Sequence, residues 1–67
     1  MDEIQKNYVA VLRADAQTCR DMARRLRFIS EHIIGDKNLM LLQAANQEAN
    51  AKEYERLAEE AERVWSK

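Results

Sequence analysis

Basic side chains recur every seven residues in the first half of the chain, and they are the residues with the clearest capacity for binding chemistry. This basic stripe consists of Lys6, Arg13, Arg20 and Arg27, and Arg24 and Arg25 lie beside it. Side chains seven positions apart share one face of an α-helix. A basic helix face can bind nucleic acid through its phosphates. The stripe therefore makes nucleic-acid binding one hypothesis for the function.

Glutamates with the same seven-residue spacing in the second half of the chain favour a different role for the stripe. They are Glu48, Glu55 and Glu62. If the two halves fold back on each other, three interhelical ion pairs are predicted: Arg13 with Glu62, Arg20 with Glu55, and Arg27 with Glu48. Such pairs at flanking positions help to fix helix orientation. We favour this interpretation, which leaves Arg24 and Arg25 unpaired.

A cationic and aromatic surface then remains for contact with another molecule. Because arginine is enriched at the energetic centres of protein interfaces, we expect a protein partner to bind there. The candidate partner-binding residues are Arg20, Arg24, Arg25 and Phe28.

Groups that could support catalysis or metal binding are few. Cys19 is the only cysteine and His32 the only histidine, so neither a disulfide nor a Cys/His zinc cluster can form within the chain. The expected position of Cys19 opposite Tyr54 predicts a packed, unreactive thiol. The sequence has no phosphate-binding loop and no nucleophile motif. We expect no enzymatic activity, no cofactor and no metal.

Two long helices that meet at Gly35 are expected to position these groups. Gly35 is the only glycine and the chain has no proline. The predicted all-α fold is an antiparallel hairpin in one domain over 1–67, with a helix over about 2–34, a turn over 35–38 and a helix over about 38–66. Gly35 can close the first helix in a left-handed conformation. Asp36 or Asn38 can cap the second.

The apolar spacing predicts which faces of the two helices meet. In the first helix the steps of three and four residues select Tyr8, Leu12, Ala16, Cys19, Met22, Leu26, Ile29 and Ile33. A strict seven-residue frame places Asp15 there instead, and the neighbouring Ala16 can shift this local contact. In the second helix the same steps select Met40, Ala44, Gln47, Ala51, Tyr54, Ala58, Ala61 and Trp65. Facing residue numbers should sum to about 73, so that large side chains mostly meet small ones. Tyr8 and Trp65 are expected to close the open end, and Asp15 is a polar defect that can set the register.

The two sets of facing residues are here called the seam. Several apolar residues fall outside the seam and predict self-association. A patch at the open end comprises Ile4, Tyr8, Val11, Leu57, Val64 and Trp65, and further apolar residues near the turn are Phe28, Ile34, Leu39, Leu41 and Leu42. Monomeric soluble proteins rarely expose contiguous apolar patches. We therefore expect a homodimer that forms a four-helix bundle or coiled-coil assembly. Docking of a different protein on the same patch is the alternative.

The overall composition indicates a broad functional class. The formal net charge is −1, the hydrophobic fraction is 46%, and no apolar run approaches the roughly 18 residues of a membrane span. The N-terminal residues lack the basic start and apolar core of a signal peptide. The sequence favours a cytoplasmic, non-membrane interaction module that regulates or inhibits a larger protein, a role common among small phage and mobile-element proteins. Alternatives are a nucleic-acid-binding hairpin dimer and a structural assembly piece.

Overall fold

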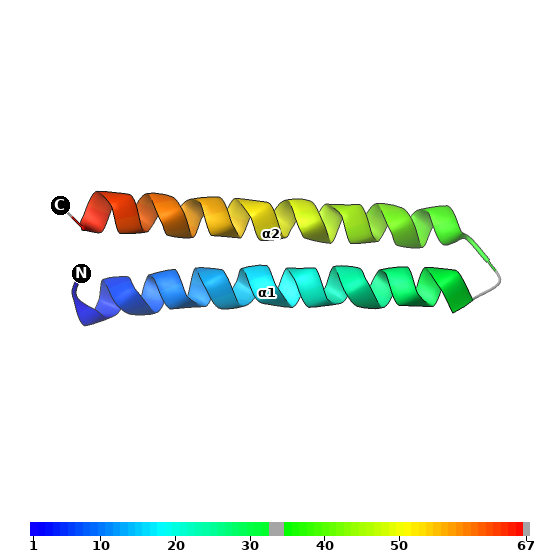
Figure 1. Ribbon diagram of the computed structural model, residues 1–67, viewed down its shortest axis with the longest axis horizontal. Coiled ribbons are helices and arrows are strands. Elements are labelled where there is room, and N and C mark those ends of the chain that lie inside the picture. Colours follow the sequence, from blue (N-terminus) through cyan, green and yellow to red (C-terminus); the bar gives the residue numbers. More distant parts are fainter. Residues whose placement is uncertain (33–34, 67) are drawn as a thin grey trace.

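Two antiparallel helices lie side by side along their whole length in the computed structural model, which describes residues 1–32 and 35–66 (Figure 1). Helix α1 spans Glu3–His32 and helix α2 spans Lys37–Trp65. The two ends of the chain lie at the same end of a rod whose extents are 52 × 15 × 10 Å. The predicted all-α hairpin is confirmed. Ile33 and Ile34, to which the sequence assigned a seam position and a patch position, lie outside the described residues.

Side-chain hydrogen bonds define where each helix begins. At the start of α1, the Gln5 backbone N–H donates to Asp2 Oδ1 (2.8 Å) and the Asp2 backbone N–H donates to Gln5 Oε1 (3.1 Å). This reciprocal pair is a capping box, which satisfies two otherwise free donors. At the start of α2, Asp36 Oδ1 accepts from the Leu39 backbone N–H (3.0 Å). Of the two predicted caps, Asp36 is therefore the one used, and Asn38 lies inside the first turn of α2.

Gly35 connects the helices in a conformation other than the expected one. Its φ angle is 159°, close to fully extended backbone. The left-handed helical conformation that often closes a helix has a φ near about +57°. Gly35 therefore has a positive φ outside the left-handed helical range, and Asp36 caps α2 directly afterwards.

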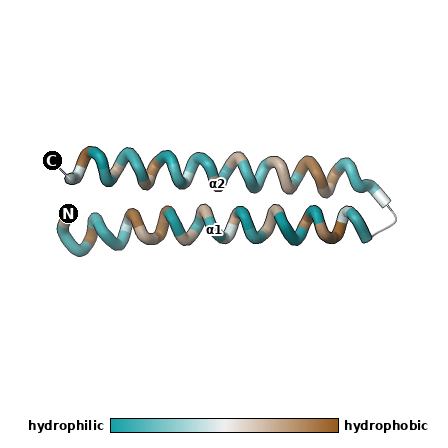
Figure 2. Tube along the Cα trace, in the orientation of Figure 1, coloured by the Kyte–Doolittle hydropathy of each residue, from teal (hydrophilic) through white to brown (hydrophobic). Residues whose placement is uncertain are grey.

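The face that α2 presents to α1 is the predicted one. Its alanines Ala44, Ala51, Ala58 and Ala61 are buried. The other four predicted seam residues, Met40, Gln47, Tyr54 and Trp65, are half-buried between them. Apolar and polar segments accordingly alternate along the helix (Figure 2).

Helix α1 is rotated about its own axis relative to the prediction, so that a different row of residues, spaced seven positions apart, faces α2. The row that contains Leu12 lies at the seam as expected, with Cys19 and Leu26 half-buried. Its companion row is Val9, Ala16, Ala23 and Ser30, all buried. The row expected there is exposed: Tyr8, Asp15, Met22 and Ile29. Asp15 is therefore not a seam residue, and it does not face Ala58 to set the register.

Small residues on both helices explain this rotation. The register places Ala16 level with Ala58, Ala23 with Ala51, and Ser30 with Ala44. Where small side chains face each other, the two backbones can approach closely and fill the space without voids. Met22 or Ile29 opposite an alanine would hold the helices apart. The larger residues therefore turn to the side of the hairpin.

The core that results is thin. Val9, Leu12, Ala58 and Ala61 form its main cluster, with Tyr54, Leu57 and Trp65 packed against it. The predicted aromatic pair is present, because the Tyr8 and Trp65 rings meet edge to face with their centroids 5.6 Å apart. Among the described residues, those with no exposed surface are alanines. Little large apolar surface is thus buried within one hairpin.

Candidate interaction surfaces

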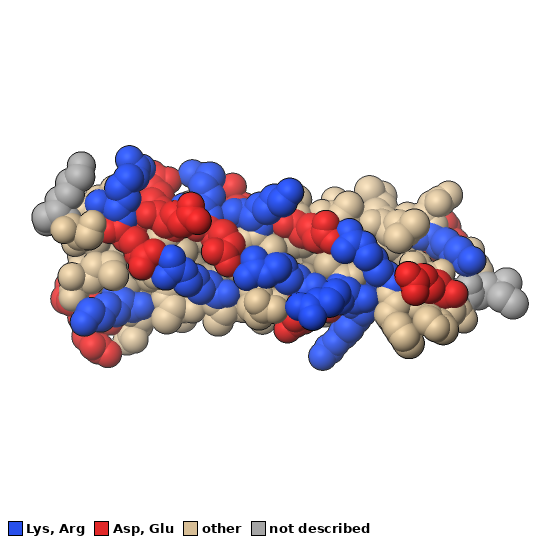
Figure 3. All heavy atoms as spheres, viewed as in Figure 1, with Lys and Arg blue, Asp and Glu red and all other residues tan. Residues whose placement is uncertain are grey.

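One side of the hairpin, here called the ion-pair flank, carries the three predicted interhelical ion pairs. Arg13 pairs with Glu62, Arg27 pairs with Glu48, and Arg20 Nη2 lies 2.9 Å from Glu55 Oε1. On this face basic side chains of α1 meet acidic side chains of α2 along the junction of the helices (Figure 3). The prediction that the basic stripe is compensated within the fold is confirmed for these three arginines.

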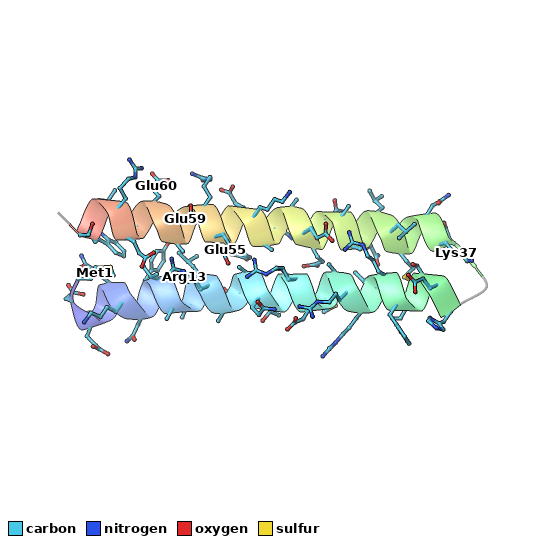
Figure 4. All side chains as sticks on the ribbon, in the orientation of Figure 1. Met1, Arg13, Lys37, Glu55, Glu59 and Glu60 are labelled. Carbon is cyan, nitrogen blue, oxygen red and sulfur yellow. The ribbon has the colours of Figure 1, made fainter. Side chains whose placement is uncertain are left out.

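The pairs shift the ionisation of their members. The hydrogen bond from Arg13 lowers the pKa of Glu62, and the hydrogen bond from Arg27 lowers the pKa of Glu48. The pKa of Arg13 is raised by its hydrogen bond to Glu62 and, to a smaller extent, by Glu55 and Glu59. Figure 4 shows Arg13 on the side of α1 that faces these glutamates. Positive charge on this flank is therefore held by neighbouring carboxylates.

These shifts predict that acid weakens the fold. Because the pKa values of Glu48 and Glu62 lie below the ordinary value of 4.5, the folded state favours their carboxylate form. Their contribution to stability is complete above that ordinary value and is lost as the pH falls through the lowered, folded-state pKa values. Urea-unfolding midpoints measured from pH 7 to pH 2.5 should be level at first and then fall.

A double variant isolates these two glutamates from the other acids. Glu48→Gln/Glu62→Gln should have a lower midpoint than the native chain at pH 7 and a shallower decline below pH 4.5. Glu31→Gln removes an exposed carboxylate that takes part in no ion pair among the described residues, and it serves as the control. Parallel pH profiles for the double variant and the native chain would refute the assignment.

A second surface lies on the outer side of α1 near the turn and is here called the outer surface. A groove there is lined by Arg24, Arg25, Phe28 and Ile29. Phe28 is 62% exposed, and its ring stacks on His32 with a centroid separation of 4.2 Å. His32 Nδ1 donates to the Phe28 carbonyl oxygen (2.7 Å), which orients the imidazole. The surface thus presents two stacked rings next to two arginines.

The two arginines differ in their pairing. Arg24 was expected to be unpaired, but its Nη2 lies 3.1 Å from Asp21 Oδ1, one helical turn away. The spacing of three residues on a helix makes this contact. Arg25 forms no ion pair with any residue of 1–32 and 35–66, as expected. Arg20, the fourth candidate, turns toward Glu55 and lines a separate groove on the ion-pair flank.

The apolar patch at the open end is brought together as predicted. Tyr8, Leu57, Val64 and Trp65 line one groove. Ile4 and Val11 extend it along α1, and Ile4 is 81% exposed. Sequence reasoning missed Glu60, which also lines this groove. A second groove on the same side is formed nearer the turn by Met22, Leu26, Gln43, Asn46 and Gln47.

The two grooves belong to one continuous side of the hairpin, here called the apolar flank. It lies opposite the ion-pair flank and consists of Tyr8, Asp15, Met22 and Ile29 from α1. From α2 it receives Gln43, Asn50, Leu57 and Val64, which follow the same seven-residue spacing. The sequence signal that could have identified this flank is the pair of small residues Ala16 and Ala23, seven positions apart. Their burial against α2 turns the row of Tyr8 and Met22 outward.

The part of the chain that the structure describes has no metal-binding cluster and no membrane-spanning helix. Within 1–32 and 35–66, no three His, Cys, Asp or Glu side chains are grouped closely enough to hold a metal ion. Neither α1 nor α2, as described, contains an apolar segment long enough to cross a bilayer. No protein-family model matches the chain, and comparison with curated proteins and with solved structures likewise gives no match.

Proposed function

We propose that the chain is a small, non-enzymatic interaction module that regulates or inhibits a larger protein by docking the outer surface of α1 on it. The observation that carries this proposal is the exposed Phe28–His32 stack beside Arg24 and Arg25. Aromatic and arginine side chains supply most of the binding energy in many protein interfaces. The partner that fits this surface has an apolar pocket rimmed by carboxylates.

The module acts as a homodimer in the cytoplasm. Its own core is built largely from alanines, while eleven large hydrophobic side chains among the described residues stay exposed. A small domain of this kind commonly gains the missing burial by association. Cys19 is a free thiol, which suits a reducing compartment.

Nucleic-acid binding receives less support. Three arginines of the basic stripe are hydrogen-bonded or ion-paired to glutamates of α2. Phosphates would have to compete with these carboxylates for each guanidinium, whereas a phosphate-binding face needs uncompensated positive charge. A purely structural role would leave the outer surface of α1 without an occupant.

A photo-crosslinking amino acid in place of Phe28 tests the docking proposal. In extract of the source cells we expect it to capture one protein, identified by mass spectrometry. Arg24→Glu on the same chain should lower the yield about tenfold, because loss of one interface arginine commonly costs more than about 1 kcal/mol of binding. Arg24 is chosen instead of Arg25 because it lies farther from the apolar flank.

Two matched controls accompany this experiment. The crosslinker at Ala14, about four helical turns earlier on the same exposed row, should capture nothing specific. Arg63→Glu makes the same charge change at the other end of the hairpin and should leave the yield at Phe28 intact. Three outcomes would each overturn the proposal. They are equal crosslinking yields at Phe28 and Ala14, a yield at Phe28 that Arg24→Glu leaves unchanged, and crosslinking of Phe28 to a second copy of this chain.

A further inference from the structure

The hairpin exposes more surface than a compact protein of its mass. Its accessible area is 5079 Å², whereas a folded monomer of 7.9 kDa exposes roughly 4,400 Å² on average. The excess follows from the rod shape, since two helices packed side by side cover only one side of each other. A second protein molecule packed against one face would bury this excess accessible area.

The chemistry of the two flanks indicates which face is covered. The ion-pair flank is occupied by charged side chains that satisfy one another. On the apolar flank, Tyr8, Met22, Ile29 and Val64 are each 40% or more exposed. A face of 52 by 15 Å has an area close to the roughly 800 Å² that each partner contributes to a stable protein interface. The apolar flank is thus large enough for a stable contact.

Charge at the two edges of the apolar flank identifies the occupant as a second copy of this chain. Along the α1 edge lies Arg25, which is unpaired among the described residues. Along the α2 edge, Glu53 and Glu60 share the single guanidinium of Arg56. The outer edge of α1 therefore carries an excess positive charge at Arg25, with Asp15 as the one acid on that side of the apolar flank, and the outer edge of α2 carries an excess negative charge. A face with this division complements itself when α1 of one copy lies on α2 of the other.

Two symmetric arrangements bring apolar flank to apolar flank, and the charges distinguish them. If the twofold axis runs along the rod, both open ends lie together and α1 of each copy packs on α2 of the other. If the axis crosses the rod, α2 packs on α2 of the second copy. Glu53 lies near the midpoint of α2 (Lys37–Trp65), so the crossed arrangement would bring the two Glu53 side chains together. Like charges that meet across an interface are costly.

Apolar matching favours the same choice. With the open ends together, Tyr8 and Val11 meet Leu57 and Val64 of the second copy. In the crossed arrangement the two open ends would be separated by the length of the rod, and Leu57 would lie against the amides Gln43 and Asn46 of the second copy. We propose that two hairpins pair through the apolar flank, open end to open end, in a four-helix bundle. This inference rests on the homodimer of the proposed function and adds its face and its orientation.

Spin labels at Glu3→Cys, in a Cys19→Ala background checked for helicity, test the orientation. With the open ends together, the labels lie under about 35 Å apart, which is two helix diameters plus the label arms. The crossed arrangement separates them by about 50 Å, the length of a helix of this size. Double electron–electron resonance should give a single distance between the two labels, shorter than about 35 Å. A distance near 50 Å would overturn the orientation and leave the dimer intact.

Light scattering on a sizing column tests the face. The native chain should have twice its monomer mass of 7.9 kDa, and a native mass of 7.9 kDa would overturn the dimer. Val64→Glu places a charge on the apolar flank and should weaken dimerisation at least about 100-fold. Leu42→Glu, on the outward row of α2, should leave the mass doubled. A dimer that survives Val64→Glu would remove the apolar flank as the interface. The measured masses do not depend on crosslinking at Phe28, so the dimer and the docking proposal are tested independently.

Discussion

Replacing Ala58 with leucine is expected to lower the free energy of unfolding by about 1–3 kcal/mol, through overpacking of the seam. Ala58 has no exposed surface and belongs to the cluster with Val9, Leu12 and Ala61. The register set by the interhelical ion pairs places it about level with Ala16, so that two small side chains face each other. A leucine there must either push the helices apart or adopt a strained rotamer. For a chain of 67 residues, whose total stability is on the order of 3–10 kcal/mol, the loss is large.

The matched control is Ala49→Leu. Ala49 lies in the same helix on the exposed side, so this substitution adds the same atoms without meeting α1. Surface substitutions of this kind usually change stability by less than about 0.5 kcal/mol. Urea-unfolding midpoints at one protein concentration should separate the two variants clearly. Equal midpoints would mean that the small residues do not set the distance between the helices.

Much of this fold could be predicted from residue spacing alone. Gly35 is the only glycine between two stretches of helical periodicity, and Asp36 offers a capping oxygen immediately after it. The seven-residue spacing of the arginines and of the glutamates predicts their pairing, because a short connection leaves one antiparallel register. These signals are local or strictly periodic, so they survive without knowledge of the packing distance.

The rotation of α1 could not be predicted in the same way. Two neighbouring rows can accompany Leu12 at the seam, and the row with Tyr8, Met22 and Ile29 is more hydrophobic than the row with Ala16 and Ala23. Hydrophobicity alone favours the first row. The alanines at 44, 51 and 58 reverse the choice, because facing small residues let the backbones approach. The contact between Arg24 and Asp21 was missed for a simpler reason: only interhelical partners were considered.

This rotation is also what creates the surfaces on which the functional proposals depend. With Tyr8, Met22 and Ile29 at the seam, one hairpin would bury more of its own apolar surface. With Ala16 and Ala23 there, the larger side chains form a flank that needs a second body. The same rotation leaves Phe28 on the outward row of α1, away from that flank. Self-association and docking of a larger protein thus centre on different sides of one helix, with Arg25 and Ile29 at the border between them.

Truncation of Leu12 to alanine is expected to have the largest effect on stability, about 2–5 kcal/mol. Leu12 is 7% exposed and, with Val9, is one of the two buried side chains larger than alanine in the main core cluster. Its removal leaves a cavity between two helices that are already held close by Ala58 and Ala61. Calorimetric or urea unfolding should show the loss, while Leu42→Ala, at a residue 59% exposed, should stay within about 0.5 kcal/mol of the native chain.

The protein concentration at which Leu12→Ala is measured should matter. Because association with a second copy stabilises only the folded state, the melting temperature of a dimer rises with concentration. A hairpin weakened by Leu12→Ala should therefore regain part of its lost melting temperature when concentrated, and Val64→Glu in the same chain should abolish that gain. A melting temperature independent of concentration in Leu12→Ala would show that the thin core of one hairpin is sufficient, and it would remove the physical reason for the dimer.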